Sequence, residues 1–281
     1  MGASGQAISR ICDVATITVQ GTEVFIEGQG AETIVCIHGW PDTHRLWDRT
    51  VQALQGRYRC VRFTLPGYEA PPPQGQKALT LAELTARLLA IVDAVSPGQP
   101  VTLLLHDWGC VFGYELAARH PARVARIVAV DIGDARSPRF LKTLGAKPKL
   151  MIVFYQFWLA KCWVLGRFVN ARFANYWTRL MARLLRSPTQ QASIHWYMNY
   201  PYAMTWLRLG GGLGGLAPFA PHCPMLYVYG QRKPFMFHSQ AWVDELNAKP
   251  GSRAVGLPTG HWVMVEQPEA FEGELLGCLG R

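Results

Sequence analysis

A carboxylate stands at the end of an apolar, strand-like run, in residues 103–109, which read Leu-Leu-Leu-His-Asp-Trp-Gly. Helix-like sequence begins directly after Asp107 and continues to Arg119. A sharp turn from a strand into a helix exposes the residue at its apex and points the next backbone N–H at the same place, as serine nucleophiles require. An aspartate there would attack a saturated carbon that bears a leaving group, and would form an alkyl ester on the enzyme. The alternative role is a helix N-cap, for which aspartate is among the best residues.

A histidine and a second tight turn offer the other groups that such a reaction needs. His261, in a Gly-His-Trp segment after the last strand-like run, is the candidate general base, because the base comes last in the chain order of this architecture. The turn at residues 38–41 reads His-Gly-Trp-Pro, and the backbone N–H of Trp40 could pair with that of Trp108 to hold an oxyanion. Pro41 makes the turn rigid, and the Trp40–Pro41 bond is a candidate cis peptide.

Strand and helix signals alternate along most of the chain, which predicts a parallel α/β domain. Strands are expected at 14–19, 22–27, 33–37, 59–65, 100–105, 124–130, 225–229 and 252–257, and helices at 42–54, 80–94, 108–119, 239–247 and 267–279. The alternation stops after Gly133, and residues 136–216 are helix-like, aromatic and rich in arginine, without a clear strand. We therefore expect a core domain in two parts, 1–135 and 217–281, with a helical cap inserted at 136–216.

The insertion contains an apolar aromatic run from Met151 to Leu165. The run is too short for a membrane span and is interrupted by Lys161, so a helical cap over a pocket, or a core helix, explains it better. Five glycines at 210–215 lie at the end of the insertion, where they suit either a hinge or a plain loop.

Composition is that of an ordinary globular chain, with 281 residues of which 49% are hydrophobic and 17% charged. This length is enough for one large core, or for a core with an inserted subdomain. The seven cysteines have no zinc or redox spacing and are odd in number, which indicates reduced thiols and a cytoplasmic compartment. Residues 1–6 carry no apolar targeting segment, and Gln6 stands where a myristoylation signal has serine or threonine.

The net charge of +9 comes with many arginines spread over residues 119–186 rather than gathered in one block. No nucleic-acid motif accompanies the charge, so we expect a solvated basic surface and no nucleic-acid partner. Weak peripheral contact with an anionic membrane stays open. The sequence offers no nucleotide or metal motif, and we expect no cofactor.

With these motifs in place, the chain resembles the α/β-hydrolase superfamily over residues 20–280, and within it the epoxide hydrolases and haloalkane dehalogenases. The His-Asp-Trp-Gly segment that contains Asp107 is similar to the elbow of both groups. The resemblance implies a mostly parallel eight-stranded sheet flanked by helices, with an inserted helical cap. The turn at 38–41 resembles the epoxide-hydrolase form, whose third position is aromatic, whereas many dehalogenases have a halide-binding asparagine there. Trp40 therefore favours the epoxide hydrolases.

The resemblance also implies a pair of cap tyrosines that act as acids on the epoxide oxygen. Trp196-Tyr197-Met198-Asn199 resembles the family's Trp-Tyr-x-Asn segment, which makes Tyr197 the first candidate. Tyr155 is the candidate partner, in a segment that is similar to the family's first-tyrosine segment only loosely. Three further cap tyrosines are held in reserve: Tyr176, Tyr200 and Tyr202.

One position departs from the family pattern. After the strand at 225–229 the superfamily usually has Gly-x-x-Asp, and here Lys233 replaces the aspartate. A cation cannot orient an imidazole through its N–H. Some haloalkane dehalogenases place the acid after the preceding strand, where Asp131 stands 24 residues beyond Asp107. We therefore expect Asp131 to orient His261, with Asp134 as the fallback acid and Lys233 as a structural or surface residue.

The sequence thus predicts an epoxide hydrolase that converts an apolar epoxide and water into a vicinal diol through an ester on Asp107. The first alternative is a haloalkane dehalogenase with the same nucleophile, in which a second indole, from Trp40 or from the tryptophan-rich cap, would replace the missing asparagine. The other alternative, motivated by Lys233, is a non-catalytic protein that binds a small molecule.

Overall fold

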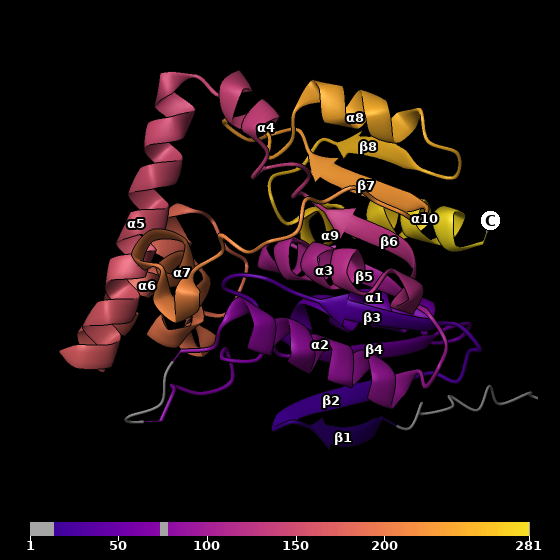
Figure 1. Ribbon diagram of the computed structural model, residues 1–281, viewed down its shortest axis with the longest axis horizontal. Coiled ribbons are helices and arrows are strands. Elements are labelled where there is room, and N and C mark those ends of the chain that lie inside the picture. The colour runs from indigo at the N-terminus through magenta and orange to yellow at the C-terminus, as the bar shows by residue number, and fades with distance from the viewer. Residues whose placement is uncertain (1–13, 74–77, 281) are drawn as a thin grey trace, which may run out of the picture.

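An eight-stranded sheet forms the centre of the computed structural model, which describes residues 14–73 and 78–280 (Figure 1). The spatial order of the strands is β1-β2-β4-β3-β5-β6-β7-β8. The β1–β2 and β2–β4 pairs are antiparallel, and every other neighbouring pair is parallel. This confirms the expected fold class and all eight predicted strands. Their bounds are β1 Ala15–Val19, β2 Thr22–Glu27, β3 Thr33–Ile37, β4 Arg59–Phe63, β5 Val101–His106, β6 Val124–Val130, β7 Met225–Gly230 and β8 Arg253–Leu257.

Helices cover both faces of the sheet, because the central strands are continuous apolar runs that need cover on both sides. The side chains of α2, α3 and α8 join the core on one face, and those of α1, α9 and α10 join the core on the other. The bounds of these helices are α1 Asp48–Leu54, α2 Leu81–Val95, α3 Trp108–Arg119, α8 Gln240–Asn247, α9 Val263–Glu266 and α10 Pro268–Leu279.

The predicted element boundaries agree with the structure to within about two residues, because local signals set them. Thr80 caps α2, with its side chain and that of Glu83 forming a reciprocal capping box. One expected helix, 42–54, differs: it begins as a 3₁₀ turn, His44–Trp47, before α1 starts at Asp48.

All described elements between β6 and β7 are helices, and they lie beyond the carboxyl ends of the parallel strands (Figure 1). The main ones are α4 Pro138–Thr143, α5 Ala146–Phe168, α6 Ala171–Leu184 and α7 Tyr200–Leu207, with a 3₁₀ turn η4 at Trp196–Asn199. The apolar run 151–165 lies within α5, and no described helix is long and apolar enough to cross a membrane. Gly210, Gly211 and Gly212 all have positive φ. The cap limits and the hinge stay predictions.

Four of the cysteines, Cys36, Cys60, Cys110 and Cys162, are buried free thiols, as the composition indicated. The predictions for residues 1–6 lie outside the described residues. Arg119, at the end of α3, reaches across to the end of the cap segment and donates a hydrogen bond to the Gly215 carbonyl oxygen at 2.7 Å.

Candidate active site

Asp107 stands at the turn between β5 and α3 with φ 52° and ψ −121°, a conformation that L-residues rarely adopt. Its side chain makes no capping hydrogen bond to α3, so the N-cap alternative is wrong. The turn is tight because two glycines allow close approach: a Cβ on Gly109 would lie 2.2 Å from the Ile37 carbonyl oxygen, and one on Gly39 would lie 2.4 Å from Asp107 Oδ1. The strained turn holds the carboxylate out of the helix.

The predicted oxyanion donors lie beside this carboxylate. The backbone N–H of Trp40 donates to Asp107 Oδ1 at 2.7 Å, and the Trp40–Pro41 bond is cis, as expected. The backbone nitrogen of Trp108 and Asp107 Oδ1 both lie 2.4 Å from the point that a Cβ on Gly39 would occupy, so the two groups face the same small space. The Trp40 N–H therefore binds Oδ1, and the backbone nitrogen of Trp108 lies in the same small space.

His261 joins two carboxylates from different strands. Its Nε2 lies 3.4 Å from Asp107 Oδ2, and its Nδ1 hydrogen-bonds to Asp131 Oδ2. Asp131 follows β6, is fully buried and also accepts a hydrogen bond from the backbone N–H of Gly230 at 3.0 Å. The structure thus brings together the predicted nucleophile, base and acid.

The fallback acid, Asp134, has other partners. It accepts hydrogen bonds from the Ser239 backbone N–H at 2.7 Å and from the hydroxyls of Ser239 and Ser137 at 2.8 and 2.7 Å. Asp134 therefore ties the start of the cap to the start of α8 instead of orienting His261.

Lys233 is not a surface residue, and this part of the expectation is wrong. Its side chain is 7% exposed and its ammonium forms an ion pair with Asp131 Oδ1. The physical reason is that β6 and β7 are neighbours in the sheet, so the loops after them meet. The sequence shows an aspartate after β6 and a lysine after β7. Only the order of the strands in the sheet shows that these two loops meet.

The close contacts within this cluster shift the pKa values of its histidine and its two aspartates. Burial lowers the pKa of His261, but its interactions with Asp131 and Asp107 outweigh burial and raise the pKa to about 9. Burial raises the pKa values of Asp107 and Asp131, but nearby charges outweigh it and both pKa values are lowered. His261 lowers the pKa of Asp107, and Lys233 and His261 lower that of Asp131. In the resting site the imidazole is therefore protonated between two carboxylates, and Lys233 supplies the second positive charge.

His106, which the sequence analysis left without a role, supports the base. Its Nε2 lies 3.2 Å from the carbonyl oxygen of His261, and since a carbonyl only accepts, Nε2 is the donor. Burial lowers the pKa of His106 to about 3, so the ring is neutral. A histidine at the end of an apolar strand was the signal in the sequence for this role. The partner could not be read from the sequence, because it lies 155 residues away along the chain.

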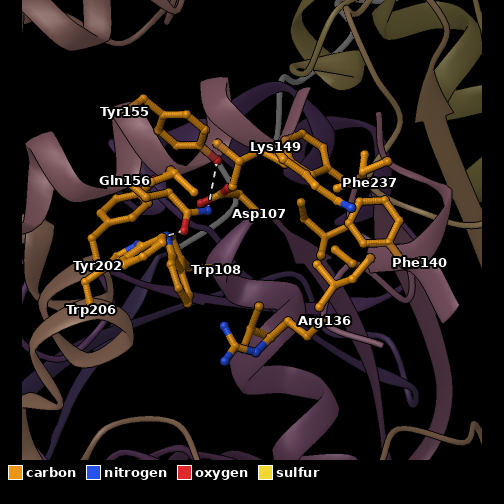
Figure 2. A pocket seen from close by; sticks show the side chains of 17 residues that line it. Asp107, Trp108, Arg136, Phe140, Lys149, Tyr155, Gln156, Tyr202, Trp206 and Phe237 are labelled. Carbon is orange, nitrogen blue, oxygen red and sulfur yellow. Dashed lines mark hydrogen bonds between the residues drawn. The ribbon is translucent and has the colours of Figure 1, made fainter. Parts of the chain in front are cut away.

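A cavity of about 500 Å³ opens over Asp107 (Figure 2). Its wall is mainly apolar and comes from the core and from cap helices α4, α5 and α7. Residues that line it include Asp107, Trp108, Val111, Ile132, Phe140, Leu144, Ile152, Tyr155, Gln156, Tyr202, Trp206 and Phe237. The described residues contain no group of three or more His, Cys, Asp or Glu side chains placed to hold a metal ion.

Two cap tyrosines line this cavity together with Asp107. The rings of Tyr155 and Tyr202 lie with centroids 6.2 Å apart, and Figure 2 shows both beside Asp107 and Trp108. The Tyr155 hydroxyl accepts a hydrogen bond from Gln156 Nε2 at 3.1 Å. Burial raises the pKa of both phenols, and the Asp107 charge raises it further, so both stay protonated. Both hydroxyls therefore carry a proton at neutral pH.

Tyr197, the first candidate from sequence, does not line this cavity. Its ring stacks on His195, with centroids 5.1 Å apart and planes at 7°. The turn is anchored by Asn199, which accepts a hydrogen bond from Trp40 Nε1 at 2.8 Å, and the next helix then presents Tyr202 to the cavity. Tyr202, a reserve tyrosine five residues later, therefore lines the cavity in place of the motif tyrosine.

The other two reserve tyrosines lie elsewhere. Tyr176 is 58% exposed, and Tyr200 is buried against Tyr68 and Phe112.

Comparison with known proteins gives one family. Residues 34–274 match the model of the "Alpha/beta hydrolase family". The chain is 35% identical over 132 residues to "Probable oxidoreductase EphD" of Mycobacterium tuberculosis, which covers 45% of this chain and 22% of that protein. It is 34% identical over 110 residues to a haloalkane dehalogenase of Mycolicibacterium smegmatis, which covers 38% and 35% of the two chains. The chain thus spans well under two thirds of these relatives.

A solved epoxide hydrolase from Bacillus megaterium has the same fold. The similarity has a TM-score of 0.70 at 19% identity and covers 95% of this chain and 100% of that one.

Proposed function

Because the chain belongs to the alpha/beta hydrolase family, we propose that it is an epoxide hydrolase, which converts an apolar epoxide and water into a vicinal diol. The observation that carries this proposal is that two protonated tyrosines, Tyr155 and Tyr202, share one apolar cavity with Asp107. Opening an epoxide needs a carboxylate on one side of the ring and an acid for the oxygen on the other, and this cavity offers both.

In the first step Asp107 Oδ2 attacks an epoxide carbon, and the C–O bond of the ring breaks. The phenol of Tyr155 or Tyr202 donates its proton to the departing oxygen, while the other phenol hydrogen-bonds to it. The product is a hydroxyalkyl ester on Asp107 and one phenolate. Oxygen Oδ1 stays in the N–H site of Trp40 and Trp108 throughout.

Esterification removes the negative charge of Asp107 and leaves a phenolate, so His261 gives up its resting proton to the phenolate through solvent. In the second step the neutral imidazole removes a proton from water, which attacks the Asp107 ester carbon. The ester carbonyl oxygen Oδ1 becomes an oxyanion that the backbone N–H groups of Trp40 and Trp108 stabilise. Asp131 holds the imidazole by its Nδ1–H and stabilises the imidazolium that forms. Collapse expels the diol alkoxide, which takes the proton from His261. The new Asp107 carboxylic acid then gives its proton to the imidazole, which restores the resting site.

A haloalkane dehalogenase is the second candidate, because one relative has that name and the acid follows β6. A departing halide needs two N–H donors that face the cavity. The indole N–H of Trp40 is bound to Asn199 at 2.8 Å, and that of Trp206 is bound to Gln156 at 3.1 Å. Trp108 would then have to bind the halide alone, which makes epoxide opening the better-supported reaction.

Intact-protein mass spectrometry of His261→Gln tests the proposal. Without the base, the ester on Asp107 accumulates, so incubation with an apolar epoxide such as styrene oxide should add the mass of the whole epoxide. The double variant that also carries Asp107→Ala is the control and should gain nothing. A gain of the alkyl group alone from a bromoalkane would establish a dehalogenase. No adduct from either class would reject both reactions and leave the binding-protein hypothesis.

A further inference from the structure

We infer that the outer face of the cap, formed by helices α5 and α6, docks on the surface of a membrane that contains anionic lipids. This interaction does not depend on the reaction proposed above. We call the outer face of α5 and α6 the cap face. The inference rests on the distribution of charge and of exposed apolar side chains over the cap.

The net positive charge of this protein comes from the cap segment. Residues 136–216 contain 12 lysines and arginines and no aspartate or glutamate. The rest of the chain contains 16 lysines and arginines against 19 aspartates and glutamates, so the net charge of +9 arises entirely from this one segment. A single-sign field of this kind attracts a polyanionic surface. The basic residues are Arg136, Arg139, Lys142, Lys147, Lys149, Lys161, Arg167, Arg172, Arg179, Arg183, Arg186 and Arg208.

Helix α5 also carries an apolar stripe on its exposed side. Leu150, Phe154, Phe157, Val164 and Phe168 follow one another at spacings of three, four or seven residues, which places them on one helix face. They are 70%, 58%, 38%, 37% and 73% exposed, respectively. A helix of a globular protein normally turns such a stripe toward the core. Here the core-facing side is already occupied by other buried residues, so the stripe is a second, outward one.

A lysine completes the stripe on α5. Lys161 occupies the vacant helical position between Phe157 and Val164, and its ammonium lies 4.7 Å from the centre of the Phe157 ring. Basic groups among exposed phenylalanine and leucine side chains are the composition of helices that lie in the membrane interface.

The apolar surface continues onto α6 through a chain of aromatic rings. Centroids of Phe154 and Trp158 are 5.7 Å apart, those of Trp158 and Trp177 are 5.0 Å apart, and Trp177 contacts both Phe173 and Tyr176, at 5.6 and 5.3 Å. Phe173 and Tyr176 are 51% and 58% exposed. The two helices therefore share one contiguous aromatic surface, and α5 forms the outer edge of the molecule on the cap side (Figure 1).

Exposed large apolar side chains are concentrated in the cap. Of the 16 large hydrophobic side chains that are exposed in the described part of the chain, 14 belong to residues 136–216. Large contiguous apolar surfaces on soluble domains mark interaction sites. The combination with the net positive charge of the cap selects the occupant: an anionic lipid surface satisfies both, because it offers headgroup charge and an apolar layer. A second copy of this face would bring like charges together.

The docked helix is also a wall of the cavity. Lys149, Ile152, Tyr155 and Gln156 of α5 line the cavity over Asp107, on the side of the helix opposite the stripe. If the proposed function holds, this placement suits an epoxide that is dissolved in the bilayer.

Vesicle co-sedimentation of the full chain tests the inference. We expect binding to vesicles of phosphatidylcholine and phosphatidylglycerol at 7:3 and little binding to pure phosphatidylcholine, with the affinity falling as salt rises. Equal binding to both vesicles, or to neither, would overturn the charge argument. Because the readout is binding and not diol formation, it is independent of the proposed activity.

Variants locate the surface. Lys161→Glu should weaken binding to anionic vesicles at least about fivefold, since one basic group near such a surface contributes about that factor, and Phe154→Ser with Phe168→Ser should weaken it further. Val265→Ser, at an exposed apolar position on the core, is the matched control and should bind as the parent does. Unchanged binding by the cap variants would refute the assignment. Dimerisation through the cap face without vesicles, or equally tight binding to a DNA duplex, would also refute it.

Discussion

Replacing Lys233 with methionine removes the ammonium that shares Asp131 with His261. Lys233 Nζ binds Asp131 Oδ1, and His261 Nδ1 binds Asp131 Oδ2, so the two cations compete for one carboxylate. In the proposed mechanism the base must be neutral to take a proton from water. Lys233 is then a positioning residue whose charge sets the pH above which ester hydrolysis runs.

The magnitude follows from the geometry. Two donors on the two oxygens of one carboxylate lie about 6 Å apart at ordinary hydrogen-bond lengths. Two unit charges at about 6 Å interact with about 2.8 kcal/mol at an effective dielectric constant of about 20, which is about two pKa units. The positive charge of Lys233 lowers the pKa of His261, so Lys233→Met raises it. We expect the acid limb of ester hydrolysis to move up by about one to two pH units.

The assay is single-turnover decay of the Asp107 ester, followed by rapid quench and mass spectrometry from pH 6 to pH 10. One unit below the shifted limb, hydrolysis in Lys233→Met should be about five- to tenfold slower than in the parent, because a smaller fraction of His261 is neutral. Formation of the ester, which uses Asp107 and the phenols, should change less.

Lys233→Arg is the control, because it keeps the positive charge beside Asp131. Its pH profile should stay close to that of the parent, even if the larger side chain lowers the rate. An acid limb that does not move in Lys233→Met, in a variant that melts as one cooperative unit, would refute the charge argument. A limb that moves equally in both variants would show that packing, and not charge, is responsible.

Three further predictions test the site. Tyr202→Phe and Tyr155→Phe should each slow ester formation by about 10²- to 10⁴-fold, as loss of a general acid does. Tyr197→Phe should form the ester at nearly the parental rate. Rapid-quench measurement of these rates tests the assignment, and the reverse ranking would make Tyr197 the proton donor. Asp131→Asn should reduce ester hydrolysis by about 10⁴-fold, measured as adduct accumulation; turnover at the parental rate would mean that another group orients the base. Gly109→Ala should destabilise the fold by at least about 3 kcal/mol in urea unfolding, because its Cβ would overlap the Ile37 carbonyl; an unchanged midpoint would show that the elbow can relax.

The elements and the elbow were readable from sequence because short-range chemistry determines them. Residues 101–106 and 108–119 differ in hydrophobic period, Thr80 and Glu83 mark a helix start, and an aspartate stands at the one sharp strand-to-helix junction with glycine two residues on. The sheet class followed from the same alternation.

Tertiary structure decided which distant groups meet. The adjacency of β6 and β7 places Lys233 against Asp131, and no spacing along the chain reports that adjacency. The hydrogen bond from Trp40 to Asn199 positions the turn before α7, so Tyr202 reaches the cavity although Tyr197 has the motif. Local patterns determine elements, but the identity of the partner across a turn or between strands depends on packing over long sequence separations, which residue type and spacing alone do not encode.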